Sequence, residues 1–255
     1  MPTLNANNAL INFAETGGGT PVVVLVHGAG GSHATWTRQL EGLAETARVI
    51  ALDLPGHGRS SGEGCPVVAE YAASVRAFIR GLNAGPVILG GHSMGGAVTL
   101  TIALEAPELL RGVLLVGTGA RLRVFPRLFE LMDKDYGEAV DFIQGYGWSP
   151  AAAPALLAGG RVAMLETRPA VTRADFTGCN RFDLMARINE IRQPALVIVG
   201  DDDQLTPPKY SEYMAKQIPG ARLVRIPRAG HYVPLEQPDQ VNAAIRSFLR
   251  WQRLT

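Results

Sequence analysis

The chain has 255 residues, of which 47% are hydrophobic and 18% are charged, with a net charge of +1. This composition excludes a disordered chain and supplies ample apolar side chains for the core of one or two domains. Because the charge is balanced and shows no run of one sign, we expect neither nucleic acid nor a membrane as a partner.

The sequence shows no feature of secretion or membrane insertion. Its first residues are polar and lack the apolar core of a signal peptide. The uncharged stretch 85–104 has a glycine-rich centre, which favours a strand and a helix over a membrane span. Cys65 and Cys179 lie far apart without metal-ligand spacing, so we expect reduced thiols in a cytoplasmic protein. The sequence assigns no oligomeric state.

In the first third of the chain, the apolar pattern alternates between that of strands and that of helices. It predicts, in order, two short strands over 4–15, a strand over 21–26, a helix over 36–44, a strand over 48–52 and a helix over 68–82. Continuous apolar runs such as 21–26 are typical of strands buried on both faces of a parallel sheet. Glycine-rich loops follow the two buried strands and begin at His27 and Asp53.

The functional hypothesis rests on a stretch near the middle of the chain. An apolar run from Val87 ends in Gly91-His92-Ser93-Met94-Gly95, and a helical pattern follows. This indicates a strand, a sharp turn and a helix, with Ser93 at the apex. Side chains at Gly91 and Gly95 would clash with the strand and helix around the turn. We therefore expect Ser93 to be a nucleophile.

The second half of the chain contains further alternating elements and one long interruption. We expect a buried strand over 112–116, a strand over 195–200, a helix over 208–217, a strand over 222–226 and a helix over 238–250. Between about 120 and 188 the pattern predicts only short helical pieces, rich in aromatic and methionine side chains. The whole predicts an α/β fold, doubly wound around a mostly parallel sheet, with a helical insertion between two strands.

A serine nucleophile needs a neighbouring base, and that base needs a third group to orient it. Among the five histidines, His231 directly follows the last expected strand, which would bring it to the same sheet edge as Ser93. The side chain of His92, next to the serine, is expected to point away from the apex. The acid should lie between the serine and the base in the chain, where the loop 201–203 offers three aspartates.

Four motifs in this order make the chain similar to the lidded α/β-hydrolases. They are His27-Gly28, the loop from Asp53 to Ser60, Gly91 to Gly95, and Gly230-His231 followed by Pro234 and Pro238. The group includes small carboxylesterases, enol-lactonases, carbon–carbon bond hydrolases and cofactor-free haloperoxidases. The resemblance covers almost the whole chain. It implies a core formed by residues 1–119 and 189–255 and a helical lid formed by residues 120–188.

The same resemblance implies roles for individual residues. In such enzymes the acid is the third residue after the strand-ending glycine, which here is Asp203, with Asp202 as the alternative. With Ser93 and His231 this completes a catalytic triad. Two backbone N–H groups form the oxyanion hole, and they fall on Ala29 and Met94.

The expected activity is cleavage of a small carboxylic ester or lactone through an acyl-enzyme, without cofactor or metal. The lid's aromatic and methionine content suits an apolar pocket, so the expected partner is a small-molecule ester-like substrate with an apolar portion. Carbon–carbon bond hydrolysis and perhydrolysis use the same triad and stay open as alternatives. A ligand receptor built on the same fold is a further alternative.

Two other groups of polar residues have weaker functional interpretations. Asp53, His57 and Arg59 are expected to pin a surface loop, with a substrate role as the alternative. Three arginines near the start of the lid are expected on a solvated helix face, with a substrate carboxylate as the alternative partner; they are Arg121, Arg123 and Arg127.

A dinucleotide site is the one cofactor hypothesis that the sequence suggests. Gly28 and Gly30 follow a strand, and Asp53 ends the next one, as in a nucleotide-binding unit. The position of the third glycine holds His33 instead, and a nucleotide would not explain Ser93 and His231. We therefore expect no cofactor.

Overall fold

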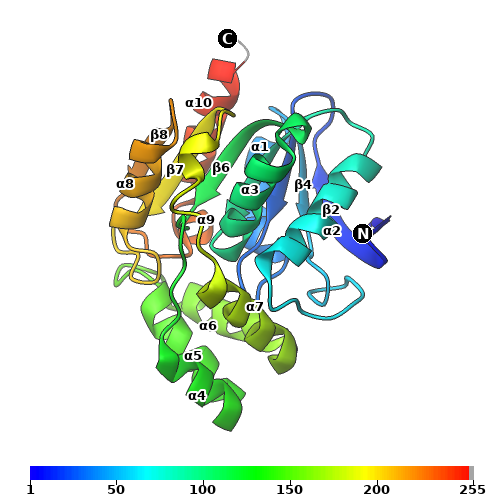
Figure 1. Cartoon of the computed structure of the whole chain (residues 1–255). Coiled ribbons are helices and arrows are strands. Elements are labelled where there is room, and N and C mark those ends of the chain that lie inside the picture. Colours follow the sequence, from blue (N-terminus) through cyan, green and yellow to red (C-terminus); the bar gives the residue numbers. More distant parts are fainter. Residues whose placement is uncertain (253–255) are drawn as a thin grey trace.

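A computed structural model describes residues 1–252 of the chain (Figure 1). Within these residues the centre is an eight-stranded sheet in the order β1-β2-β4-β3-β5-β6-β7-β8. Strands β3 to β8 run parallel to one another, whereas β1 pairs with β2, and β2 with β4, in antiparallel fashion. The strands are β1 (Thr3–Ala6), β2 (Ala9–Thr16), β3 (Val22–Val26), β4 (Arg48–Leu52), β5 (Val87–His92), β6 (Leu110–Val116), β7 (Ala195–Gly200) and β8 (Arg222–Ile226). The predicted mostly parallel α/β sheet is confirmed.

Helices cover both faces of the sheet, as a doubly wound fold requires (Figure 1). Helix α10 (Pro238–Gln252) packs on one face together with α1 (Thr37–Leu43) and the buried Trp36. The other face carries α2 (Val68–Gly81), α3 (Met94–Glu105) and α8 (Pro208–Gln217). Helix α3 is apolar almost all round and correspondingly buried on nearly every side.

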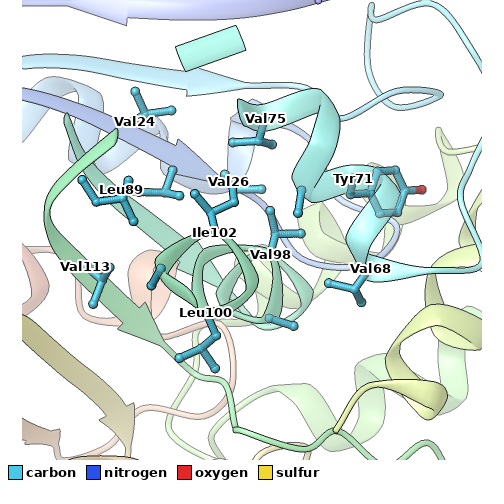
Figure 2. Close-up of a cluster of buried hydrophobic side chains, with 14 of the residues drawn as sticks. Val24, Val26, Val68, Tyr71, Val75, Leu89, Val98, Leu100, Ile102 and Val113 are labelled. Carbon is cyan, nitrogen blue, oxygen red and sulfur yellow. The ribbon is translucent and has the colours of Figure 1, made fainter. Parts of the chain in front are cut away.

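The apolar run of β3 explains how one strand serves both cores. Successive side chains of a strand point to opposite faces. Val24 and Val26 therefore join the core under α2 and α3, where Figure 2 shows them beside Leu89 of β5 and Val98 of α3. Val23 and Leu25, which alternate with them along the strand, face the core under α1 and α10.

Between β6 and β7 the chain leaves the sheet and forms a helical insertion at one end of the molecule (Figure 1). Its helices are α4 (Pro126–Lys134), α5 (Tyr136–Gly147), α6 (Pro154–Leu165) and α7 (Pro169–Arg181). Proline in the first turn begins three of them, and Asp135 caps α5 by accepting from the Glu138 amide over 3.0 Å. The insertion has an apolar cluster of its own, and its two ends lie together, since the Leu184 amide donates to the Ala120 carbonyl over 2.7 Å.

The strand order places a topological switch point between β3 and β5. The chain turns from β3 to β4 on one side and later to β5 on the other, and ligands of open α/β sheets bind at the carboxyl ends of such strands. The register pairs Val26 with Gly91, so the loop after β3 and the turn after β5 begin side by side.

Several expected elements have the bounds that the sequence pattern predicts, among them β4, β7, α8 and β8. Other elements differ. A short 3-10 helix (His33–Trp36) precedes α1, and α9 (Val233–Glu236) was not expected because it is only four residues long. Within residues 1–252 no helix combines the length and the apolar character that a membrane crossing requires.

Candidate active site

Ser93 occupies the sharp turn between β5 and α3. Its backbone φ of +53° is a value that residues other than glycine rarely adopt, so the turn holds the serine in a strained backbone conformation. A Cβ on Gly91 would run into the Gly95 carbonyl, and a Cβ on Gly95 would lie 2.7 Å from the carbonyl oxygen of His27. The two flanking glycines are therefore required by the close approach of α3 to the sheet. The predicted strand, turn and helix are all present.

Asp203 and His231 lie against one another at the carboxyl ends of β7 and β8. Nδ1 of His231 is 3.0 Å from Oδ2 and 3.2 Å from Oδ1 of Asp203. Burial alone would raise the pKa of Asp203, but the His231 ring and donors from Thr206 outweigh it and hold that pKa below its usual range. The carboxylate is therefore ionised and able to orient the imidazole.

The hydroxyl of Thr206 is a member of this cluster that the sequence analysis did not identify. Its Oγ1 donates to Oδ2 of Asp203 over 2.8 Å and lies 3.2 Å from Nδ1 of His231. The backbone amides of Leu205 and Thr206 both donate to Oδ1 of the same aspartate. An aspartate in a turn commonly accepts from the amide two residues on, as Asp203 does from Leu205, but this pattern does not identify the Thr206 hydroxyl.

The other two aspartates of the 201–203 loop face different partners. Asp201 is paired with Arg225 on the surface over 2.7 Å. Asp202 accepts a hydrogen bond of 2.6 Å from the Ser149 hydroxyl. Among the three predicted acids, the structure therefore brings only Asp203 to the histidine.

The loop that carries His231 is tied to the end of α5. The His231 amide donates to the Gly147 carbonyl over 2.7 Å, and Glu236 accepts from the amides of Gly230 and Ser149 over 2.9 Å each. These bonds fix the backbone on both sides of the histidine. Its ring and Ser93 line the same cavity, and within the described residues no hydrogen bond joins the serine hydroxyl to the imidazole. Such bonds often form only when substrate is present.

The loop after β3 brings Ala29 to the same cavity. A Cβ on Gly28 would lie 3.1 Å from that of Ser93, which shows how closely this loop approaches the serine. The Gly28 carbonyl accepts hydrogen bonds from Nδ1 of His27 over 2.8 Å and from the Gly31 amide over 3.1 Å. Since the C=O and N–H of a trans peptide point in opposite directions, these bonds direct the Ala29 N–H away from His27.

His27 is suited to this task by its fixed tautomer. The Leu54 amide donates to Nε2 over 3.0 Å, so the ring's single proton is on Nδ1, from which it is donated to the Gly28 carbonyl. Burial and the nearby His57 lower the pKa of His27 to about 4, which keeps the ring neutral. Met94, the other expected oxyanion donor, is the first residue of α3, where backbone N–H groups lack intrahelical acceptors.

His92 lies closer to the site than the sequence analysis expected. Its ring centroid is 4.7 Å from that of His231, its Nε2–H donates to the His231 carbonyl over 2.9 Å, and it lines the same cavity as Ser93. Burial and the His231 ring lower the pKa of His92 to about 3. The neutral ring of His92 therefore supports the backbone of His231 and is a poor proton acceptor, so His231 is the candidate general base.

The cavity between the sheet edge and the insertion measures about 340 Å³. Its lining is mainly apolar and includes the side chains of Phe125, Ile143, Trp148, Leu156, Met164 and Phe176. Among the lining residues, Arg123 is the one lysine, arginine, aspartate or glutamate. Arg127, on α4, is exposed and paired with Glu130, as a solvated helix face implies. Arg121 is also exposed and is paired with Asp183, but it lies in a β-bridge before α4 and not on a helix.

The loop after β4 differs from the expectation in one respect. Asp53 does pin this loop, since it accepts hydrogen bonds from the Arg59 amide, from Asn12 and from both the amide and the ring of His33. The loop lies only partly at the surface, however, because Gly58 and Arg59 are exposed whereas Asp53 and His57 are fully buried. His57 instead contacts the insertion through Asp175, over 2.8 Å. Within residues 1–252 no group of three or more His, Cys, Asp or Glu side chains is placed to hold a metal ion.

Comparison with known proteins assigns the family. The model of the alpha/beta hydrolase family matches residues 23–244. The chain is 32% identical to the dihydrolipoyllysine-residue acetyltransferase component of the acetoin cleaving system of Pseudomonas putida, covering 94% of this chain and 67% of that protein. It is 30% identical to the (E)-2-((N-methylformamido)methylene)succinate hydrolase of Acinetobacter baylyi, covering 96% of this chain and 95% of that protein.

A solved structure shows the same likeness in three dimensions. The malate-bound thermophilic esterase from Thermogutta terrifontis superimposes with a TM-score of 0.90 at 29% identity and covers 98% of each chain. The matched segment contains the turn at Ser93, the Asp203 loop and the His231 loop. The chain therefore belongs to the alpha/beta hydrolase family, and it is an esterase-like hydrolase.

Proposed function

We propose that the protein cleaves a small carboxylic ester or lactone with Ser93, His231 and Asp203 as its catalytic triad. The observation that carries this proposal is the buried His231–Asp203 pair, with Nδ1 3.0 Å from Oδ2, facing the cavity that the strained serine turn also lines. A base oriented in this way has its other ring nitrogen free for a serine hydroxyl.

In the proposed reaction, Oγ of Ser93 attacks the carbonyl carbon while Nε2 of His231 takes the hydroxyl proton. The negative charge that forms on the carbonyl oxygen is stabilised by the N–H groups of Ala29 and Met94. Collapse of this intermediate breaks the bond to the alcohol, which receives the proton from His231. Water then attacks the carbonyl carbon of the acyl-enzyme while His231 takes its proton. The acid product leaves, and the Ser93 hydroxyl is restored by the proton that His231 returns.

We further propose that residues 120–188 act as a lid over the serine, with residues 1–119 and 189–252 as the hydrolase core. The last three residues of the expected core, 253–255, lie outside the part of the chain that the structure describes. The insertion supplies most of the apolar side chains of the cavity. The β-bridge between Arg121 and Asp183 joins the two ends of the insertion where it leaves the core. A cavity of about 340 Å³ with such a lining favours a small substrate that has an apolar portion. The hydrolase from Acinetobacter baylyi and the esterase from Thermogutta terrifontis support hydrolysis of a small molecule.

A serine-directed phosphonate tests the proposal. Wild-type protein should be labelled once, at Ser93, and should turn over at least one member of a panel of p-nitrophenyl esters and lactones. Ser93→Ala should lose both labelling and turnover. If the wild-type protein resists the phosphonate and hydrolyses no member of the panel, while it binds a small apolar ligand tightly, the protein is a receptor and the proposal is wrong.

A further inference from the structure

The helical insertion holds Gly30, the residue after Ala29, at both of its backbone polar groups. Oδ2 of Asp175, on α7, accepts a hydrogen bond of 2.8 Å from the Gly30 amide. The Thr167 hydroxyl, in the turn before α7, donates to the Gly30 carbonyl over 3.0 Å. Both side chains are buried, and Gly30 itself has a φ of +65°, which favours glycine. The loop after β3 is thus bonded to a segment more than 130 residues later in the chain.

Asp175 is itself fixed by two residues of the core. Its Oδ2 lies 2.8 Å from Nε2 of His57, and its Oδ1 accepts from the Tyr71 hydroxyl over 2.5 Å. In Figure 2 the hydroxyl of Tyr71 points away from the labelled apolar side chains of the cluster. Nδ1 of His57 lies 3.1 Å from the Pro55 carbonyl, so both ring nitrogens face acceptors and both carry protons.

The resulting ion pair is fully buried. Burial opposes the charge on His57, but the Asp175 carboxylate outweighs burial and raises the pKa of this histidine. A buried carboxylate is tolerated only when it is paired and hydrogen-bonded on all sides, as Asp175 is here. The hydrogen bond that Asp175 accepts from Gly30 is charge-assisted, and such bonds are roughly twice as strong as neutral ones.

These contacts bear on the direction of the Ala29 N–H. The peptide before Ala29 is fixed by its carbonyl, which His27 and the Gly31 amide hold from the core side. The peptide after Ala29 is fixed by its N–H, which Asp175 holds from the insertion side. With both neighbouring peptide planes anchored, Ala29 has little freedom in either φ or ψ.

We propose that Asp175 and Thr167 are positioning residues that align the Ala29 N–H with the oxyanion. This inference rests on the proposed function of Ser93 and Ala29. It gives the insertion a second task beside covering the cavity, because it supplies half of the support for the oxyanion loop. An oxyanion donor is effective when its N–H already points to the place where the negative charge will form. Loosening the contacts to Gly30 should therefore slow the chemical step and leave substrate binding intact.

Thr167 offers the sharpest test, because its hydroxyl can be removed with little change of shape. Thr167→Val should lower kcat for p-nitrophenyl butyrate with an unchanged KM, by about tenfold, since loss of a whole oxyanion donor costs about 10²–10³-fold. Thr167→Ser keeps the hydroxyl and should retain wild-type kcat. The matched control is Thr177→Val, on α7, whose hydroxyl donates to the Arg173 carbonyl on the surface.

A second variant and a second measurement separate positioning from folding. Asp175→Asn should lower kcat at least as much as Thr167→Val, with Asp133→Asn as its control, since Asp133 is an exposed lid aspartate paired with Arg173. Both positioning variants should also bind a trifluoromethyl ketone more weakly, by the same factor as kcat falls, because that inhibitor forms an oxyanion on Ser93. If Asp175→Asn fails to fold, the Thr167 pair decides the matter.

The outcomes distinguish the two proposals. If wild-type protein is active and folded Thr167→Val retains both kcat and ketone affinity, the positioning role is wrong while the proposed function stands. A change in KM alone would likewise overturn it, since that is a binding effect. If wild-type protein turns over no ester or lactone and resists the phosphonate, the proposed function fails and the positioning role fails with it.

Discussion

The Ser149 hydroxyl donates a hydrogen bond of 2.6 Å to Oδ2 of Asp202. This contact turns Asp202 toward the end of α5, while its neighbour Asp203 faces His231. Two successive residues of this tight loop thus have different partners: Asp202 binds Ser149 of the insertion, and Asp203 binds His231 of the candidate triad. Since the two aspartates differ by a single position, their amide variants make a sensitive comparison.

We predict that Asp203→Asn lowers kcat by about 10⁴-fold, because an amide at this position favours the wrong imidazole tautomer. Asp202→Asn should retain most of the activity, since its contact to Ser149 lies outside the triad. The measurement is ester turnover by each purified variant, with circular dichroism to establish that both are folded. A crippled Asp202→Asn beside an active Asp203→Asn would reverse the assignment of the acid.

The turn at Ser93 gives a prediction about folding. A side chain at Gly95 would meet the backbone carbonyls of β3 and its following loop, including that of His27 at 2.7 Å, and backbone has no room to move there. Gly95→Val should therefore fail to fold or unfold at a much lower temperature than wild type, by the mechanism of core overpacking. Thermal unfolding of the purified variant measures this effect.

Gly145 provides the matched control for that substitution. It is exposed on α5, and a Cβ at this position meets nothing within 4 Å. Gly145→Val should keep the stability within about 1 kcal/mol of wild type, because the added Cβ meets no other group and valine is a better helix former than glycine. A fully stable and active Gly95→Val variant would contradict the argument from close approach.

The elements that the sequence predicts best are those whose pattern is local. The buried strands β4 and β7, the edge strand β8 and the helix α8 are bounded by local signals such as apolar runs, glycine and proline, which act over a few residues. The turn at Ser93 was readable for the same reason, since both required glycines lie within two residues of the serine. Motif order along the chain then located the histidine and the loop of three aspartates, and the resemblance to the α/β-hydrolases selected Asp203 among them, with Asp202 as the alternative.

The supporting contacts could not be predicted in this way, because they join distant parts of the chain. Nothing near Gly30 in the sequence indicates that Asp175 binds its amide, and nothing near His57 indicates a buried ion pair with the insertion. One signal was present: Asp175 lies at helical spacing among residues that α7 buries. A carboxylate on the buried face of a helix implies a partner, but the sequence does not identify which one.

The buried histidines predict how stability depends on pH. The pKa of His27 is lowered to about 4 and that of His92 to about 3, against about 6.5 in an unfolded chain. Between these values the unfolded chain binds protons that the folded chain does not, so their contribution to stability is present above about pH 6.5 and is lost as pH falls. The depressed pKa of Asp203, lowered chiefly by His231 against the effect of burial, acts in the same direction at more acidic pH.

The measurement is the free energy of unfolding in urea between pH 7 and pH 5, which should fall by a few kcal/mol, given about 1.4 kcal/mol per proton and pH unit. His57 acts in the opposite direction, since its raised pKa gives stability that is lost as pH rises through its folded value. His27→Gln keeps an acceptor for the Leu54 amide and a donor for the Gly28 carbonyl. It should make the free energy of unfolding less steeply dependent on pH, by the contribution of about one proton. An unchanged slope in this variant would show that His27 is not held neutral by the fold.

The size of the proposed substrate can be tested at the mouth of the cavity. Gly159, on α6, lines the cavity, and a Cβ built there meets nothing within 4 Å. Gly159→Leu should therefore fold normally and narrow the space available to an apolar chain. We predict that kcat/KM for p-nitrophenyl octanoate falls by about tenfold or more relative to the acetate, since each displaced methylene is worth about 1–3 kcal/mol in such a pocket.

The same substitution at Gly145 is the control, because that glycine is equally unobstructed but lies on the exposed side of α5, outside the cavity lining. Gly145→Leu should leave the ratio of octanoate to acetate turnover unchanged. If Gly159→Leu also leaves it unchanged, the acyl chain does not extend beneath α6, and the apolar portion of the substrate must occupy another part of the cavity. If both variants lose octanoate turnover equally, the effect comes from altered packing of the insertion, and the predicted placement of the chain is wrong.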